Sequence, residues 1–174
     1  TYEQHDNEKG SFYKNTVKAY DSGDILEDYL EVDVCIIGGG LTGVSSALHL
    51  AKKGYKVAIC ESRLIGWGAS GRNGGQLGNG MRKDQFFLEA KLGIDHAKEL
   101  WNLGLEGVQN ALDLINKYKI DCNLQNGVIS AGCFSNDLKH FEDEKKHLEK
   151  YYNYKDLKEL DKNQIRKEIN SDLY

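Results

Sequence analysis

The spacing of apolar positions predicts a βαβ unit in the first half of the chain. Residues 32–37 are mostly apolar, and residues 44–51 place apolar side chains at helical spacing. A second apolar run follows at residues 57–60. We expect a β-strand, an amphipathic helix that begins near Leu41, and a second strand that pairs with the first.

The second half of the chain is predicted to be mainly helical. Residues 82–118 are predicted to be helical. Apolar residues between 100 and 118 recur at steps of three and four, and Asp95 is expected to be the N-cap. Ser135 is expected to cap a charged helix that runs to about residue 151, and Asp161 a last short helix. Between these helices, residues 122–124 and 128–134 flank an Asn-Gly pair, which predicts a β-hairpin.

The turn between the first strand and the helix has the glycine spacing of a dinucleotide-binding motif. Gly38 permits the sharp turn out of the strand, and Gly40 leaves room for a pyrophosphate against the backbone. Gly43 lets the helix pack closely on the sheet. The helix beginning near Leu41 points unpaired N–H groups and the positive end of its dipole at the pyrophosphate.

An acid ends the second strand. Glu61 follows Gly38 by 23 residues and is placed to accept hydrogen bonds from a ribose diol. Its charge would repel a 2′-phosphate, so FAD or NAD fits the motif and NADP does not. A plain glycine-rich turn is the simpler alternative, but the flanking strand, the helix and the acid favour the nucleotide site.

Residues 62–81 form a loop that contains seven glycines. The glycines allow main chain to approach a flat or phosphorylated ligand. Ser70, Asn73 and Gln76 supply hydrogen-bonding groups, and Arg72 supplies a cation for phosphate. A flexible linker is the competing interpretation. Trp67, Arg72 and Gln76 are unusual residues for a linker, so we favour ligand binding.

Composition narrows the class of protein further. With 174 residues the chain is expected to form one domain, and its net charge of −4 without a basic patch argues against nucleic acid as a partner. No signal-like segment or membrane-length apolar run is present, so the cytoplasm is expected. The four cysteines lack zinc spacing and are expected to be buried reduced thiols, and no metal site is predicted.

The remaining aromatic and ionisable residues are expected to be structural. Trp101 lies on the apolar stripe of the long helix and is expected in the core. His49 is expected to be packed or surface-exposed rather than catalytic, and His96, His140 and His147 are expected to be solvated. No catalytic acid or base is nominated.

Residues 32–61 followed by G-W-G-A-S-G-R-N-G-G-Q at 66–76 resemble the amino-terminal end of FAD-dependent amine and amino-acid oxidoreductases, the D-amino-acid-oxidase-like family. Similarity also touches residues 11–13, 120–122 and 171–174. The resemblance implies an α/β fold, a Rossmann-like FAD-binding domain of the glutathione-reductase type. That domain would be incomplete here, with helical and β-hairpin insertions. Residues 1–31 would be a polar leader that wraps the domain surface. Residues 32–174 would be the amino-terminal part of the FAD-binding domain, with the first substrate-domain elements.

The resemblance also implies a role for each matched residue. The pyrophosphate would be held at the glycine turn, the adenosine ribose at the acid, and the ribityl chain along the glycine-rich loop. Some relatives attach the flavin through a histidine in this loop. Residues 62–80 contain none, so non-covalent FAD is expected. The residues concerned are Gly38, Gly40, Leu41, Thr42, Gly43, Glu61, Ser62, Arg63, Ser70, Arg72, Asn73, Gly74, Gly75 and Gln76.

The chemistry implied is oxidation of a C–N bond in a small-molecule amine or amino acid, with hydride transfer to the flavin. Family members are more than twice this length, so these 174 residues alone are expected to be inactive. Two other functions stay open, a NAD-dependent dehydrogenase and a nucleotide-binding module without turnover. The glycine-rich loop argues against the first, since a simple NAD domain has no use for it directly after the acid.

Overall fold

A computed structural model describes residues 12–17, 23 and 25–170. The chain divides into two units, residues 1–76 and residues 77–174. The first holds the βαβ motif and the glycine-rich loop, and the second is helical. Within the described ranges, no helix combines the length and the apolar character needed to cross a membrane.

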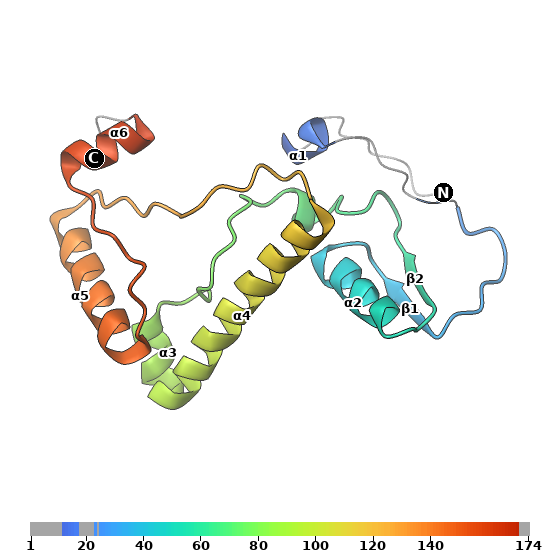
Figure 1. The fold of residues 1–174 in the computed structure, drawn as a ribbon, viewed down its shortest axis with the longest axis horizontal. Coiled ribbons are helices and arrows are strands. Elements are labelled where there is room, and N and C mark those ends of the chain that lie inside the picture. The colour runs from blue at the N-terminus through green and yellow to red at the C-terminus, as the bar shows by residue number, and fades with distance from the viewer. Residues whose placement is uncertain (1–11, 18–22, 24, 171–174) are drawn as a thin grey trace. The chain divides into compact units, whose positions relative to one another are not determined.

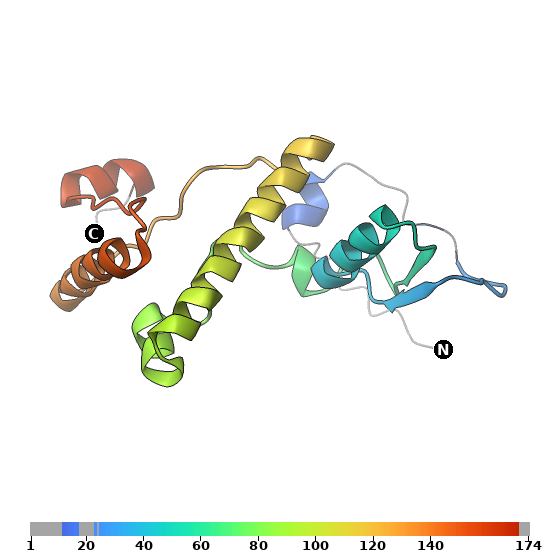
Figure 2. The same cartoon turned by 60° about the horizontal axis from the view of Figure 1, so that its bottom comes forward.

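The first unit is built on two parallel strands and one helix. Strand β1 (Val34–Ile37) pairs with β2 (Val57–Cys60), with Val34 opposite Val57 and Ile37 opposite Cys60. Helix α2 (Leu41–Lys52) connects them and lies against one face of the pair, as Figures 1 and 2 both show. The predicted βαβ unit is therefore confirmed, and the α/β class with it.

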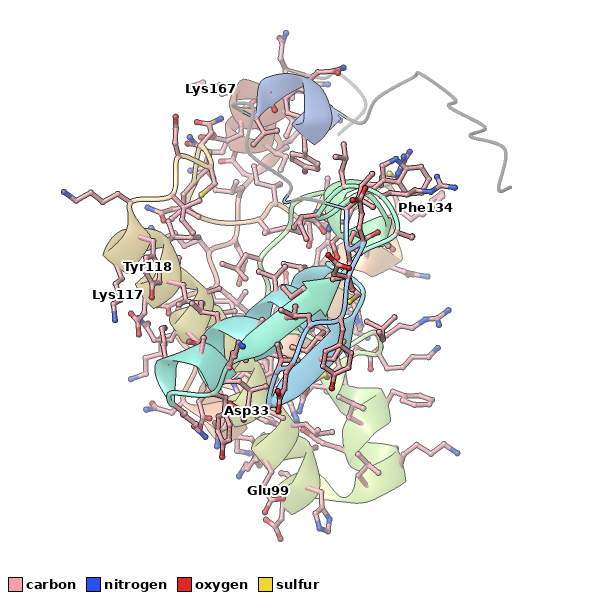
Figure 3. The ribbon with its side chains drawn as sticks, turned by 90° about the vertical axis from the view of Figure 1, so that its right-hand side faces the viewer. Asp33, Glu99, Lys117, Tyr118, Phe134 and Lys167 are labelled. Atoms are coloured by element: carbon pink, nitrogen blue, oxygen red, sulfur yellow. The ribbon has the colours of Figure 1, made fainter. Side chains whose placement is uncertain are left out.

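Side-chain chemistry closes the amino-terminal end of this small sheet. Asp33, labelled at that end in Figure 3, accepts a hydrogen bond from the Lys56 N–H at 2.7 Å through Oδ2. Its own N–H donates to the Lys56 carbonyl at 2.9 Å. These bonds fix the register of β1 against β2, so that both strands end together at the glycine turn and Glu61.

The face of the sheet opposite α2 is open in this unit. Cys35 is exposed, and Ile37 on the same face is 83% exposed. The expectation of buried thiols is thus wrong, since Cys122 and Cys133 are exposed too and Cys60 is only half-buried. The reason is local, because no described element of unit 1 covers this face.

The four cysteines are nevertheless free, as expected. The sulfurs of Cys35 and Cys60 lie 3.7 Å apart, and their hydrogen bond raises the pKa of the Cys35 thiol. The register pairs Cys35 with Ala58, two residues before Cys60. Two residues along a strand and one strand spacing separate Cα atoms by about 8 Å. That separation is beyond the reach of a disulfide without movement of the backbone.

Most of the leader lies outside the described residues, which exclude 1–11, 18–22 and 24. The expectation that it wraps the domain surface therefore stays a prediction. Its described part includes the short helix α1 (Phe12–Thr16). The Tyr13 hydroxyl of this helix lies against Gly75, where an added Cβ would collide with it. The two ends of unit 1 thus meet at the glycine-rich loop.

In the second unit, the predicted helix over residues 82–118 is two helices. Helix α3 (Gln85–Leu92) ends at Gly93, whose φ of +79° only glycine adopts readily, and α4 (Ile94–Tyr118) follows at once. Asp84 caps α3, accepting from the Phe87 N–H at 2.8 Å. The prediction of Asp95 as N-cap is wrong, because Gly93 holds that position and Asp95 lies inside the first turn of α4. Figure 3 labels Lys117 and Tyr118 at the far end of α4.

The predicted hairpin is absent from the described structure. Residues 122–134 are irregular and form no strand. A two-residue Asn-Gly turn of the hairpin type needs positive φ at both positions, and here Gly127 has it while Asn126 does not. Val128 and Ile129 are exposed, so pairing of the two segments would gain no stabilisation from burial of these side chains.

The last two helices begin and end close to where the sequence predicts. Helix α5 runs Ser135–Tyr152, but its N-cap position is Phe134 rather than Ser135. Asp137 accepts from the N–H groups of Cys133 and Phe134 at 2.9 and 3.0 Å and so stabilises the helix start. Helix α6 runs Lys162–Ile169, and the Asp161 cap is confirmed by bonds from the Asn163 and Gln164 N–H groups.

The core of the second unit gathers where α3, α4 and α5 meet. Ala97, Trp101 and Leu148 are its buried apolar residues, and the Trp101 ring packs on Tyr152 and Tyr154 at centroid distances of 5.4 and 5.2 Å. The prediction that Trp101 is a core residue is confirmed.

A polar cluster adjoins this core. Glu89 Oε1 accepts from the Tyr152 hydroxyl at 2.6 Å and lies 2.7 Å from His147 Nε2. Gln85 Nε2 donates to the Tyr152 hydroxyl and to the Ala97 carbonyl. His147 is 18% exposed, so the expectation that it is solvated is wrong. The sequence pattern around His147 is that of a charged surface helix, and the long-range contacts with Glu89 and Phe86 of α3 help to shield it.

Candidate functional site

The glycine turn between β1 and α2 has the close packing that its sequence predicts. Gly38 has φ of +99°, and its N–H donates to the Cys60 carbonyl at 2.8 Å. A Cβ on Gly43 would collide with the Gly38 carbonyl oxygen and lie 3.3 Å from Ile36 Cγ2. Gly43 therefore allows α2 to begin directly against the turn and the strand, as the motif requires.

The first turn of α2 presents unpaired backbone donors. Among the residues that the structure describes, the N–H groups of Gly40, Thr42 and Gly43 have no acceptor. The Gly40 position lacks a side-chain cap, so nothing from the helix itself covers these groups. Unpaired N–H groups and the helix dipole together favour an anion at this point.

Glu61 lies beside the turn and is held there by main chain. Its Oε2 accepts from the buried Gly39 N–H at 2.7 Å, and Oε1 accepts from the Arg63 N–H at 2.9 Å and from the Ser62 hydroxyl at 3.4 Å. The Gly39 bond is the main cause that lowers the pKa of Glu61, followed by the Arg63 bond. The carboxylate is therefore ionised at neutral pH, and with about four lone-pair sites it keeps capacity for further donors.

The glycine-rich loop returns to the start of α2 through Ser70. The Ser70 hydroxyl oxygen accepts from the Leu41 N–H at 2.9 Å, and a Cβ on Gly40 would lie 3.0 Å from the same oxygen. The Gly66 N–H also donates to the Gly39 carbonyl at 2.8 Å. The structure thus brings the start of the loop against the glycine turn.

Arg72 is anchored within the loop. Its Nε donates to the Trp67 carbonyl at 2.8 Å, and its guanidinium carbon lies 4.3 Å from the Trp67 ring centroid. The guanidinium carbon of Arg63 lies 3.7 Å from the same centroid. Both guanidinium groups therefore pack on the same indole ring, just after the C-terminal end of β2.

The rest of the loop is shaped by its own hydrogen bonds. Asn73 Nδ2 donates to the Ser70 carbonyl at 2.9 Å and Asn73 Oδ1 accepts from the Gly75 N–H at 2.8 Å, so this amide holds the loop. Gly74 has open space around its Cα, and Gln76 is exposed. Phe12, Tyr13, Arg72 and Asn73 line an open hollow of about 330 Å³.

Sequence reasoning missed three participants in this arrangement. Gly39 supplies the N–H that holds Glu61, and an added Cβ there would collide with Ile65. The Trp67 ring packs against the guanidinium groups of Arg63 and Arg72, and Tyr13 packs on Gly75. An aromatic residue with arginine four positions before and five after it was a usable signal for the stacking. Nothing in the sequence indicated the Tyr13 contact.

Comparisons with known proteins agree with this geometry. Residues 33–172 match the family model described as FAD dependent oxidoreductase. The chain is 41% identical over 164 residues to gamma-glutamylputrescine oxidoreductase of Escherichia coli, covering 94% of this chain and 38% of that protein. It is 35% identical over 142 residues to the probable oxidoreductase OrdL of Haemophilus influenzae, covering 82% and 33%. No solved structure matches.

A shorter match concentrates on part of the chain. Thiamine thiazole synthase of Methanothermobacter thermautotrophicus is 47% identical over 65 residues, which are 37% of this chain and 22% of that protein. The chain spans about a third of the length of its two longer-matching relatives. The family match itself covers most of the chain, so the protein belongs to the FAD-dependent oxidoreductase family.

Proposed function

We propose that this chain supplies the site for the adenosine and pyrophosphate half of FAD in an enzyme that oxidises the C–N bond of an amine or amino acid. The observation that carries the proposal is the row of unpaired N–H groups at Gly40, Thr42 and Gly43 beside the ionised Glu61. A group of N–H donors that binds an anion, next to a carboxylate that can accept hydrogen bonds from a ribose, matches the chemistry of an ADP group.

The residues present fit the cofactor. The Gly40, Thr42 and Gly43 N–H groups would donate to the pyrophosphate. The N–H groups of Gly38 and Leu41, expected there as well, already donate to the Cys60 carbonyl and the Ser70 hydroxyl, so these two residues would shape the turn instead. Glu61 would accept from the ribose, bordered by Ser62 and Arg63. Ser70, Arg72, Asn73, Gly74, Gly75 and Gln76 would follow the ribityl chain. When bound, FAD supplies the acceptor for a hydride from the substrate α-carbon, and the resulting imine hydrolyses to a carbonyl compound and an amine.

The substrate class comes from the relatives. The E. coli protein is named for gamma-glutamylputrescine, a small amine, and we propose a substrate of this kind for the parent enzyme. Residues 62–80 contain no histidine, which supports non-covalent FAD. A NAD-dependent dehydrogenase is the alternative. The glycine-rich loop supports FAD, because a simple NAD domain has no use for such a loop directly after the acid.

The finer fold assignment is also part of this proposal. We assign residues 32–174 to the amino-terminal part of a glutathione-reductase-type FAD-binding domain with the first substrate-domain elements. The chain spans 38% of the E. coli relative, so the surface that covers the flavin ring and binds substrate is proposed to come from further chain. On this proposal the 174 residues bind FAD weakly and turn over no substrate.

Calorimetric titration of the purified chain with FAD tests the cofactor assignment. Wild type should bind, and Gly40→Val should abolish binding, since the new side chain would occupy the space of the pyrophosphate. Gly68→Val is the matched control, because the Gly68 position has open space and a negative φ. Since Gly40 lies next to Ser70, circular dichroism must show that the variant keeps its helices. A folded Gly40→Val chain with wild-type affinity would overturn the assignment.

Anaerobic flavin bleaching tests whether the substrate site lies outside these 174 residues. The FAD-loaded chain should not bleach with gamma-glutamylputrescine, D-amino acids or N-methyl glycine, whereas the full-length parent should bleach with one of them. Bleaching of the 174-residue chain would place the substrate site within these residues and contradict the proposal.

A further inference from the structure

Trp67 lies between two arginines, and the proposed function gives this tryptophan no role. The guanidinium carbons of Arg63 and Arg72 lie 3.7 and 4.3 Å from its ring centroid. The Trp67 carbonyl also accepts from Arg72 Nε at 2.8 Å, which ties the main chain of Trp67 to the loop. The indole is thus fixed by Arg72 and holds Arg63 through its π-face.

Arg63 is close to Glu61 in sequence, but its guanidinium is directed elsewhere. The Arg63 N–H donates to Glu61 Oε1 at 2.9 Å, so the two main chains are adjacent. Across the described part of the chain, no ion pair joins the Glu61 carboxylate to the Arg63 guanidinium. A long, exposed arginine two residues from an ionised carboxylate would ordinarily move toward it. Its guanidinium lies on the Trp67 ring instead.

This placement matters for the choice of nucleotide. In dinucleotide sites, an acid at the end of the second strand accepts the ribose hydroxyls, whereas an arginine nearby accommodates a 2′-phosphate. This chain has both groups within three residues. Whichever of them faces the ribose decides whether a 2′-phosphate is repelled or attracted.

We propose that Trp67 is a specificity-determining, positioning residue: by holding the Arg63 guanidinium on its ring, it leaves Glu61 unopposed at the ribose and so strengthens the preference for nucleotides without a 2′-phosphate. The inference rests on the proposed function, since it requires an ADP group at the glycine turn. Its ligand class is a nucleotide with a free adenosine 2′-hydroxyl.

The size of the effect follows from the interaction. A cation–π contact at an exposed site changes a population by a factor of about two to five. Trp67 is 36% exposed, which puts it in this class. Removal of the π-face should therefore reduce the preference for the unphosphorylated nucleotide by about two- to five-fold.

The experiment is a set of titrations with two stable probes, ADP-ribose and 2′-phospho-ADP-ribose, which differ only at the ribose 2′ position. The ratio of their dissociation constants is measured for wild type, Trp67→Leu, Trp67→Phe, Arg63→Ala and the double variant Trp67→Leu/Arg63→Ala. Leucine keeps an apolar side chain without the π-face, and phenylalanine restores the π-face. Circular dichroism checks the fold of each variant.

The proposal predicts that Trp67→Leu relaxes the preference by about two- to five-fold and that Trp67→Phe restores most of it. In the Arg63→Ala background, Trp67→Leu should have no effect, because there is no guanidinium to release. An unchanged preference in Trp67→Leu, or a relaxation that persists without Arg63, would overturn the inference and leave the FAD site intact. If wild type binds neither probe, the proposed function fails and this inference fails with it.

Discussion

Glu61 in the first unit and Glu89 in the second are both partly buried carboxylates with a lowered pKa, but they are held in opposite ways. Glu61 is held by backbone N–H groups, above all that of Gly39. For Glu89, desolvation is the largest influence and alone would raise the pKa, and hydrogen bonds from Tyr152 and His147 outweigh it. One carboxylate depends on a local turn, and the other on side chains about 60 positions away.

On the proposed function, the difference separates a binding group from a structural one. Glu61 is tied to rigid main chain while retaining acceptor capacity beside a row of unpaired N–H groups. Glu89 is 17% exposed and directs one oxygen at two donors from α5, beside the packed ring of Trp101. We therefore expect changes at Glu61 to alter ligand affinity and changes at Glu89 to alter stability.

The largest expected effect is on FAD binding in Glu61→Ala. Hydrogen bonds to a charged acceptor contribute about 1.5–3 kcal/mol, so the dissociation constant for FAD should rise about ten- to a hundred-fold. Isothermal titration with FAD measures it.

Asp33→Ala is the matched control for that variant. Asp33 also accepts a backbone N–H at 2.7 Å, but at the opposite end of the same sheet. The Asp33→Ala variant should lose about as much free energy of unfolding as Glu61→Ala, and its FAD affinity should stay that of wild type. Equal loss of affinity in both variants would show that Glu61 acts only by supporting the fold.

The first unit could be predicted from its sequence because its determinants are local. The strand, turn, helix and acid lie within 30 consecutive residues, and each glycine needed for close packing is visible in the sequence. The structure places Glu61 beside the glycine turn, and it also brings Ser70 there, although Ser70 was assigned to the ribityl chain. The arginine stacking on Trp67 was missed, because cation–π pairing leaves no periodic pattern.

The second unit was predicted less well because its contacts are long-range. Asp161 was found, since a capping box is a four-residue signal. The start of α4 was placed at Asp95 rather than Gly93, because aspartate is a common N-cap residue and the sequence does not show the positive φ of Gly93. The burial of His147 depends on Glu89, 58 positions earlier, and no local feature indicates it. The hairpin failed because turn residues alone do not bury the strands they join.

A smaller effect, on stability, is expected for Glu89→Ala. The change leaves the Tyr152 hydroxyl and His147 Nε2 without their acceptor, which should lower the free energy of unfolding by about 1–3 kcal/mol. Urea denaturation followed by Trp101 fluorescence measures it, in a Trp67→Phe background where Trp101 is the one remaining indole of the two. Glu142→Ala, which removes an exposed pair with Lys146, should cost less than about 0.5 kcal/mol.

The FAD affinity of Glu89→Ala tests whether Glu89 also takes part in ligand binding. It should match wild type, because Glu89 serves the fold of the second unit. A tenfold weaker affinity would place Glu89 in the ligand site and remove the distinction between the two carboxylates.

The smallest expected effect is a pH dependence carried by Tyr152. Burial, and then its hydrogen bond to Glu89, raise the pKa of this tyrosine from 10.0 to about 12. A group whose pKa is higher in the folded state stabilises the fold fully below its unfolded pKa, and the contribution is lost as pH rises through the folded value. Tyr152 should therefore stabilise the second unit up to about pH 10 and lose that contribution between about pH 10 and 12.

Denaturation midpoints of wild type and Tyr152→Phe across this range isolate the effect, since all other groups are shared. The two midpoints should converge as pH rises, because wild type alone loses the contribution of the neutral hydroxyl. Parallel curves would mean that the Tyr152 hydroxyl is in water and that Glu89 does not hold α5 to α3.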